Sequence, residues 1–170
     1  MHLTSLLAPH GRPAVTDALQ QVLQVVRRRL GMDVAFISEF VGDQRVFRWV
    51  DTEEPIAGLS PGLGDPLAES YCQRIVDGTL DRIVPDTAEN PTTHALDVTR
   101  TLRIGNYIGT PLRLSNGELY GTLCCFSSAP DRTLNVRDLD YLNDVAEIVT
   151  VTLSAADASR REHAPIRDGL

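Results

Sequence analysis

Apolar residues recur at three- and four-residue intervals in two long stretches, one near each end of the chain. The first stretch follows Pro13 and ends at Gly31, a residue type that commonly terminates helices. The second follows Asn135, a favourable N-cap residue with Asp138 at the third helical position, and fades after Ala158. The pattern therefore predicts one long amphipathic helix near each end.

Between these helices, the first run of β-branched and aromatic residues predicts a hairpin. Residues 34–41 and 46–50 alternate in the manner of strands, and a Gly-Asp turn separates them. Side chains two positions apart on a strand share a face, so we expect Phe47 and Trp49 to lie on the same face.

A second hairpin is predicted from residues 106–114 and 118–127, which flank an Asn-Gly turn. The second of these strands is almost entirely apolar, which is typical of a central strand covered on both faces. Cys124 and Cys125 are neighbours in this strand, so their side chains are expected on opposite faces.

Shorter elements are predicted between the two hairpins. Residues 51–66 are rich in Pro and Gly and predict a loop, and residues 67–76 predict a short helix. A short strand at 82–85 follows, and then a helix capped by Thr92 or Thr93 that runs to about residue 102.

Taken together, the predicted order is helix, hairpin, helix, strand, helix, hairpin, helix. Antiparallel hairpins flanked by helices predict an α+β fold with the helices packed on a central sheet. A length of 170 residues fits one domain. We expect the domain to span 14–157, with a flexible segment at 1–13 and a polar tail or linker at 158–170.

Composition and charge narrow the classes of partner. The chain carries a net charge of −7 and is 42% hydrophobic. Its basic cluster, residues 27–29, falls at the end of the first predicted helix, where cations are favourable. Nucleic-acid binding is therefore not expected. No stretch approaches the ~20 apolar residues of a membrane helix, so we predict a cytoplasmic protein with no membrane partner.

The three cysteines do not form a recognisable metal or disulfide motif. Their number is odd, and no Cys-x-x-Cys pair is present. Cys72 is interpreted as a small buried apolar residue, since a redox thiol would need a neighbouring cation and exposure. No catalytic triad, phosphate loop or metal motif is evident, so no catalytic residue and no metal site is predicted.

Three segments carry a resemblance to a known family. They are Glu-Ser-Tyr-Cys-Gln at 69–73, Ile-Val-Pro-Asp-Thr at 83–87, and the second hairpin, with Tyr-Ile-Gly-Thr-Pro-Leu at 107–112 and Gly-Glu-Leu-Tyr-Gly-Thr-Leu at 117–123. In this order the chain resembles a GAF domain over about residues 15–156. The resemblance implies a sheet of about six antiparallel strands, with the terminal helices on one face. It also implies a ligand pocket on the other face, under short helices and loops.

The candidate ligand-binding residues lie on the segments that would surround such a pocket, and each has a structural alternative. The aromatic residues could equally pack in a core, Asp86 could cap local backbone N–H groups, and His94 could be a haem ligand or an exposed polar residue. The predicted set is Phe36, Trp49, Tyr71, Asp86, Thr87, His94, Tyr107 and Thr122.

The resemblance also bears on the ligand and on the function. The residue set of cyclic-nucleotide-binding members cannot be placed here, and residues 87–106 contain no cysteine for covalent bilin attachment. The ligand and any cofactor stay unidentified. We expect a non-enzymatic sensor domain of a bacterial signalling protein. It would form a homodimer through its terminal helices and control an output domain such as a cyclic-di-GMP enzyme or a histidine kinase.

Two alternatives stay open. One is a thiol-dependent reductase of the free-methionine-sulfoxide type that uses Cys72 with Cys124 or Cys125. The other is a ligand-free dimerisation module in which aromatic side chains fill the pocket.

Overall fold

The computed structural model describes residues 13–162, which form helices around one sheet. The helical elements are α1 (Pro13–Leu30), the 3₁₀ turn η2 (Leu67–Glu69), α2 (Tyr71–Asp77), α3 (Pro91–Ala95), α4 (Asp97–Thr101) and α5 (Val136–Glu162). The strands are β1 (Val34–Val41), β2 (Gln44–Thr52), β3 (Gly64–Pro66), β4 (Ile83–Val84), β5 (Asn106–Arg113) and β6 (Leu119–Ser127).

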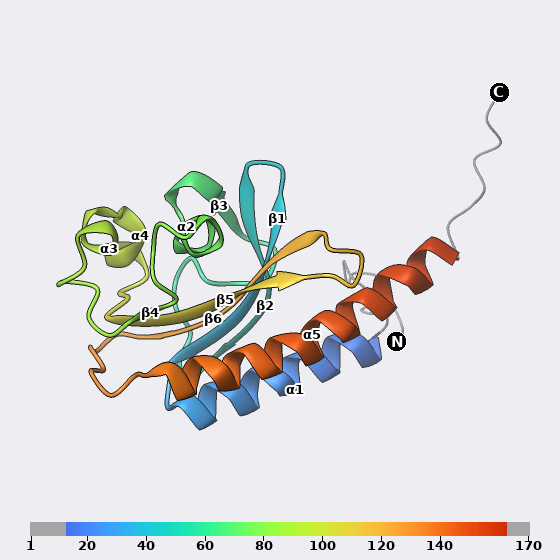
Figure 1. The fold of residues 1–170 in the computed structure, drawn as a ribbon, viewed down its shortest axis with the longest axis horizontal. Coiled ribbons are helices and arrows are strands. Elements are labelled where there is room, and N and C mark those ends of the chain that lie inside the picture. The colour runs from blue at the N-terminus through green and yellow to red at the C-terminus, as the bar shows by residue number, and fades with distance from the viewer. Residues whose placement is uncertain (1–12, 163–170) are drawn as a thin grey trace.

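The six strands form one antiparallel sheet in the order β3-β2-β1-β6-β5-β4. Helices α1 and α5 lie side by side on one face, and α2, α3 and α4 lie on the other (Figure 1). The α+β prediction is therefore confirmed. No helix among residues 13–162 has the length and apolar character needed to cross a bilayer.

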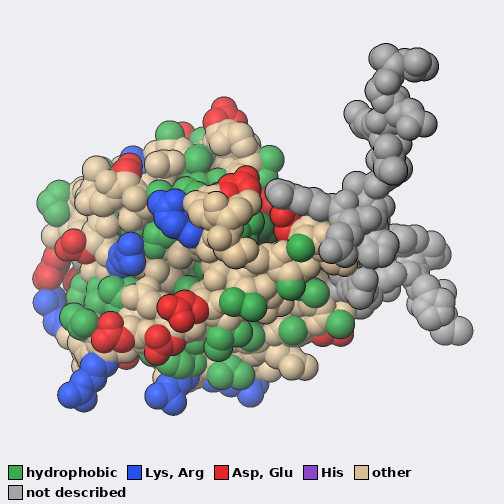
Figure 2. Space-filling view, turned by 45° about the vertical axis from the view of Figure 1, so that its right-hand side comes forward, with side chains coloured by type: hydrophobic (Ala, Val, Ile, Leu, Met, Phe, Trp, Pro, Cys, Tyr) green, Lys and Arg blue, Asp and Glu red, His purple; other side chains and the backbone are tan. Residues whose placement is uncertain are grey.

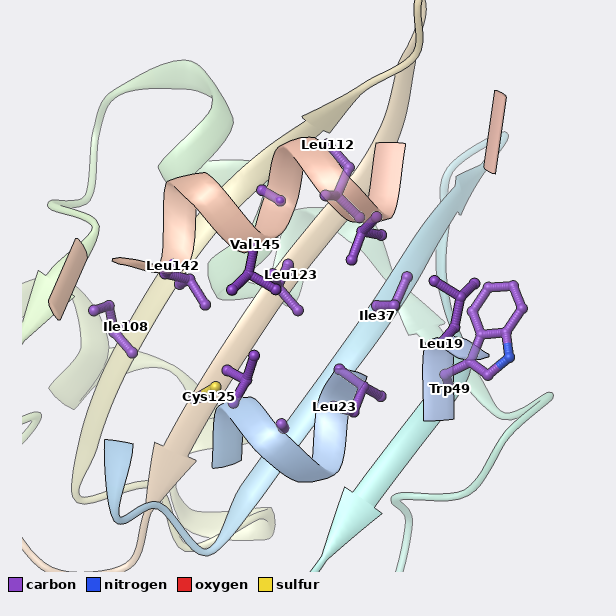
Figure 3. Packing of buried hydrophobic residues seen from close by; sticks show 14 of the residues in the cluster. Leu19, Leu23, Ile37, Trp49, Ile108, Leu112, Leu123, Cys125, Leu142 and Val145 are labelled. Atoms are coloured by element: carbon purple, nitrogen blue, oxygen red, sulfur yellow. The ribbon is translucent and has the colours of Figure 1, made fainter. Parts of the chain in front are cut away.

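Strand β6 divides the hydrophobic interior into two layers. Leu123 and Cys125 point toward α1 and α5 (Figure 3), whereas Cys124 and Phe126 belong to the layer beneath α2. Cys124 and Cys125 lie on opposite faces, as the alternation predicts. Both cysteines are fully buried, which confirms that β6 is a central strand covered on both sides.

The prediction that Phe47 and Trp49 share a face is wrong. Ile37 pairs with Trp49 and Ser38 pairs with Phe47, so Arg48 is left without a partner in the ladder. This β-bulge adds one residue to β2 and reverses the alternation. Phe47 therefore packs beneath α2, while Trp49 joins the layer under α1, beside Leu19 (Figure 3).

The short elements differ in detail from the predicted ones. Ser70 interrupts the predicted helix 67–76 and caps α2, accepting a hydrogen bond from the N–H of Gln73. The cap of α3 is Asn90, not Thr92 or Thr93, because its side chain can accept from both of their N–H groups. The predicted helix from there to residue 102 breaks into α3 and α4, and β3 forms within the predicted loop 51–66.

The two terminal helices behave largely as predicted. The side chain of Asn135 accepts from the N–H of Arg137, and Asp138 accepts from the N–H of Asn135. This reciprocal pair starts α5 at Val136. Helix α5 continues to Glu162, four residues beyond Ala158, where it was expected to fade. Of the predicted flexible segment 1–13 and the predicted tail 158–170, residues 1–12 and 163–170 lie outside the described residues.

Candidate functional site

The space between the sheet and α2 is packed with aromatic side chains. Phe36 meets Phe47 edge to face with ring centroids 5.1 Å apart, and Tyr71 meets Tyr107 at 5.0 Å. All four rings are at most 2% exposed. The hollow expected at this position is therefore filled by side chains.

A polar cluster lies inside this aromatic layer, at the N-terminal turn of α2. The hydroxyl of Thr122 donates to the sulfur of Cys72 at 3.1 Å, and the hydroxyls of Ser38 and Thr122 are 2.7 Å apart. On the other side of the cluster, the hydroxyl of Tyr107 lies 2.8 Å from the sulfur of Cys124. Three strands and one helix thus bring together polar atoms that have no access to water.

Arg45 supplies the positive charge of this cluster. Its side chain is 3% exposed, and its guanidinium binds both carboxylate oxygens of Asp65 on β3. Its Nη1 donates to the sulfur of Cys72 at 3.6 Å. The guanidinium carbon also lies 4.6 Å from the centre of the Phe47 ring. The buried charge of Arg45 is thus stabilised by the carboxylate of Asp65, the sulfur of Cys72 and the ring of Phe47.

The pKa values of the two thiols in the cluster shift in opposite directions. Burial disfavours the thiolate of Cys72, but a hydrogen bond with Cys124, the charge of Arg45 and the hydroxyl of Thr122 outweigh it and lower the pKa of Cys72. Burial raises the pKa of Cys124, and the neighbouring Cys72 raises it further. The surroundings therefore favour ionisation of Cys72 over ionisation of Cys124.

A chain of hydroxyl groups fastens α3 and α4 to the rest of the site. Tyr71 bonds to the hydroxyl of Thr99, which donates to the carbonyl of Thr93. Thr93 donates to the carbonyl of Thr87 at 2.7 Å, and Thr87 donates to the carbonyl of Ile104. Burial raises the pKa of Tyr71 to about 12, so this phenol stays protonated at neutral pH.

An open cleft of about 410 Å³ lies beside the filled layer, at one end of the sheet. It is bordered by residues that connect several elements, with apolar side chains and four charged ones. The lining residues are Asp33, Glu53, Glu54, Pro55, Ile56, Leu102, Arg103, Phe126 and Ser128. Binding sites commonly combine an apolar body with a few polar groups in this way.

Two residues of the cleft are notable for their geometry. Asp33 accepts hydrogen bonds from the N–H of Ser128 at 3.0 Å and from its hydroxyl at 3.3 Å. Arg103 has a φ of 53°, a left-handed conformation that is strained for a residue with a side chain. No ion pair joins Arg103 to another residue in the described part of the chain, so its charge is available at the rim.

The structure brings together half of the predicted site residues. Phe36, Tyr71, Tyr107 and Thr122 are all buried in the layer beneath α2. They pack against one another or bond within the polar cluster, and none of them lines the cleft.

The other predicted residues lie elsewhere. Thr87 is buried and bonded to backbone. Asp86 accepts from the N–H of Ala88 at 3.0 Å and pairs with Arg132, which matches its capping alternative. His94 is exposed and Trp49 is on the opposite face. The expected clustering of these four around a pocket is not observed.

Sequence reasoning missed Arg45, Asp65 and most of the cleft. An arginine in a strand is usually exposed, and its partner Asp65 lies 20 residues away in what was expected to be a loop. The adjacent carboxylates Glu53 and Glu54 are both exposed at the cleft. Within the described residues, no group of three or more His, Cys, Asp or Glu could hold a metal ion.

Comparison with known families agrees with this architecture. The family model described as GAF domain matches residues 14–153, which is most of the chain. The chain belongs to the GAF domain family. No curated protein sequence matches the chain significantly.

Solved GAF structures share the fold at low sequence identity. A far-red cyanobacteriochrome photoreceptor aligns with a TM-score of 0.67 at 18% identity, covering 91% of each chain. The phycoerythrobilin-bound GAF domain of a cyanobacterial phytochrome aligns at 0.69 and 16% identity, covering 86% of this chain and 88% of its own.

An enzyme also shares this GAF fold. The free methionine-R-sulfoxide reductase of Neisseria meningitidis, solved in complex with its substrate, aligns at 0.67 and 17% identity. The alignment covers 85% of this chain and 81% of the reductase. Because the same fold supports pigment binding and catalysis in these proteins, the activity of this GAF domain must be argued from its own residues.

Proposed function

We propose that this GAF domain is a regulatory module of a bacterial signalling protein that binds a small molecule in the cleft at the end of the sheet. The observation that carries the proposal is the cleft of about 410 Å³, whose apolar lining is flanked by charged side chains. A cleft that combines apolar surface with a few polar groups is the usual form of a ligand site.

The charges at the cleft suggest the class of ligand. Asp33, Glu53 and Glu54 are negative, and Arg103 is positive. Phe126 and Leu102 belong to the buried apolar layer and also line this cleft. A small molecule that carries an amine, a carboxylate and a short apolar body would complement these groups.

The position of the cleft offers a route from the ligand to both terminal helices. Asp33 lies three residues after the end of α1. Ser128, whose N–H donates a hydrogen bond to Asp33, lies on the connection between β6 and α5. The N–H of Glu53 also donates to the carbonyl of Asp33 at 3.0 Å. Binding that moves Asp33 would therefore act on the ends of two helices, which could bias a following output domain.

The direct test is native mass spectrometry of the purified domain, to look for a small molecule that co-purifies with it. Binding to amino-acid-like zwitterions can be measured by calorimetry. Absence of any bound mass, together with no heat from a panel of zwitterions, amines and carboxylates, would refute the proposed cleft function.

An Arg103→Gly variant should separate ligand binding from stability. Glycine adopts the left-handed conformation without strain, so the substitution is expected to stabilise the fold by about 1 kcal/mol. Loss of the guanidinium should weaken binding of a carboxylate-bearing ligand roughly tenfold or more. Chemical denaturation and calorimetry measure the two effects. The control is Arg113→Ala, which removes an exposed charge at the end of β5. It should change neither the stability nor the ligand affinity.

We also propose that the domain forms a homodimer through α1 and α5. Val25 on α1 and Ile148 and Val151 on α5 are 58–70% exposed. The lower part of Figure 2, where these helices lie, shows hydrophobic side chains set between acidic and basic ones. Exposed apolar residues on paired helices are suited to burial against a second copy.

Substituting Ile148 with Glu should shift the protein to monomer, because a dimer through this face would bury the new charge. Light scattering at high protein concentration measures the change. The matched control is Leu63→Glu, which alters an exposed leucine outside the two helices. A wild-type protein that is monomeric at high concentration would contradict the proposal.

Two other functions have specific support. The filled aromatic layer favours a ligand-free dimerisation module, which would show a stable dimer and no bound small molecule. The presence of Cys72 and Cys124 in one buried cluster favours a thiol-dependent reductase. Neither cysteine lines the cleft, however, so a substrate in the cleft would not reach them. Turnover of free methionine sulfoxide that is lost in Cys72→Ser would establish the reductase, and no turnover would exclude it.

A further inference from the structure

The buried cluster around Cys72 contains a pair of thiols that the proposed cleft function does not use. Cys72 is on α2 and Cys124 is on β6, and both belong to the same buried cluster. Thr122, whose hydroxyl lies 3.1 Å from the sulfur of Cys72, is two residues before Cys124 and so faces the same side of β6. We propose that these two cysteines are an oxidation site, at which a hydroperoxide converts the pair to a disulfide.

The surroundings of Cys72 favour a nucleophilic sulfur. Its sulfur accepts from the hydroxyl of Thr122 at 3.1 Å and from Nη1 of Arg45 at 3.6 Å, and the hydroxyl of Ser38 lies at 3.8 Å. Hydrogen bonds and a fixed cation stabilise a thiolate more than a thiol. The lowered pKa of Cys72 is consistent with this geometry.

Cys124 is positioned to resolve the oxidised product. The hydroxyl of Tyr107 is 2.8 Å from its sulfur, and burial keeps the pKa of both groups high. Cys124 therefore favours the protonated thiol while Cys72 is reduced, and it loses that proton when it attacks the oxidised sulfur.

The chemistry balances with a hydroperoxide as the oxidant. The Cys72 thiolate attacks the nearer peroxide oxygen, the O–O bond breaks, and the departing oxygen takes up a proton to leave as water or an alcohol. Cys72 is then a sulfenic acid. The sulfur of Cys124 attacks it, an S–S bond forms, and the hydroxyl leaves as water with the proton of Cys124. Two thiols lose two electrons, which reduce the peroxide.

Burial determines how the oxidant arrives. Cys72 and Cys124 are both 0% exposed. A peroxide can therefore reach them only when α2, a helix of seven residues, moves away from the sheet. We expect slow oxidation that accelerates on warming below the unfolding transition.

The neighbouring residue on β6 supplies a matched control. Cys125 is also 0% exposed, but it lies on the opposite face of the sheet among apolar residues, and burial raises its pKa to about 12. Cys124 and Cys125 thus share strand, burial and chemistry and differ in whether Cys72 is within reach.

The test is oxidation of the full wild-type chain with hydrogen peroxide, followed by acid quenching, alkylation and peptide mapping by mass spectrometry. The expected result is a loss of about 2 Da, the mass of two hydrogen atoms, in a cross-linked peptide pair that contains Cys72 and Cys124, with Cys125 alkylated. A reductant should restore both thiols. Because this experiment needs no variant, it does not depend on the folding of any substitution.

Two variants test the order of the steps. Cys124→Ser should leave a sulfenic acid on Cys72 that dimedone traps, and Cys125→Ser should form the same disulfide as the wild type. A native chain that keeps all three thiols after prolonged treatment, or that cross-links Cys125, would overturn the proposal. Neither outcome would affect ligand binding in the cleft, so the two proposals can fail separately.

Discussion

A Gly121→Ala variant is expected to lose about 3 kcal/mol of unfolding free energy, the upper end of the usual cost of overpacking. Gly121 lies on β6, opposite Glu39 of β1 at the centre of the sheet. A Cβ atom at this position would stand 1.9 Å from the carbonyl oxygen of Ser38 and 2.7 Å from its carbonyl carbon. Both neighbours are backbone atoms of a paired strand, so they cannot rotate away as a side chain could.

The added methyl group would force β1 and β6 apart at the position where the polar cluster forms. Ser38 bonds to Thr122, the residue next to Gly121, and both contact Cys72. Separation of the strands would therefore disturb this cluster as well as the ladder. We therefore expect the backbone amides of α2 to exchange with solvent faster than in the wild type, even under conditions in which the variant still folds.

The matched control is Gly42→Ala in the turn between β1 and β2. Gly42 has a φ of 59° and no atom within 4 Å of a Cβ position, so the substitution introduces backbone strain without a collision. Its cost should be about 1 kcal/mol. Urea denaturation followed by circular dichroism measures both variants. Equal losses in the two would contradict the argument, since both would then reflect only the loss of glycine.

The comparison of these two glycines indicates what a sequence can reveal. Gly42 follows a strand pattern and precedes Asp43, so its place in a turn is predicted from neighbouring residues. The requirement for glycine at 121 arises from the carbonyl of Ser38, 83 positions earlier in the chain. Local patterns do not report such a contact.

The same distinction explains the candidate site. The alternation in β6 predicted that Cys124 and Cys125 face apart, because a period of two holds throughout that strand. The same alternation gave a wrong prediction in β2, because the bulge at Arg48 places Trp49 in the layer opposite Phe47. The cleft was not predicted because Asp33, Glu53 and Arg103 meet only after the sheet has formed.

An Asp65→Asn variant is expected to lose about 3 kcal/mol, because it leaves the guanidinium of Arg45 buried without a carboxylate. Arg45 is 3% exposed, and both carboxylate oxygens of Asp65 accept from it. The amide that replaces the carboxylate retains one acceptor and removes the negative charge. Asp65 is itself 31% exposed, which places the expected cost at the lower end of the range for breaking buried pairs.

The matched control is Asp97→Asn, which makes the same change in the ion pair with Arg100. These side chains are 91% and 65% exposed, so water replaces the lost partner and the stability should stay within experimental error. Urea denaturation of both variants, at the same pH and salt concentration, measures the difference that burial makes.

The double variant Arg45→Met with Asp65→Asn should recover most of the stability lost in Asp65→Asn alone. A methionine would occupy the space against Phe36 and Phe47 that the arginine now fills, and no charge would stay buried. The Cys72 sulfur would lose its cation, so its oxidation by peroxide should slow in the same variant. If Asp65→Asn proves as stable as the wild type, the expected cost is contradicted, and the Cys72 sulfur at 3.6 Å is the remaining hydrogen-bond partner that can stabilise the guanidinium. In that case, removing the sulfur with Cys72→Ala in the Asp65→Asn background should unfold the domain, whereas the same change in the wild type should not.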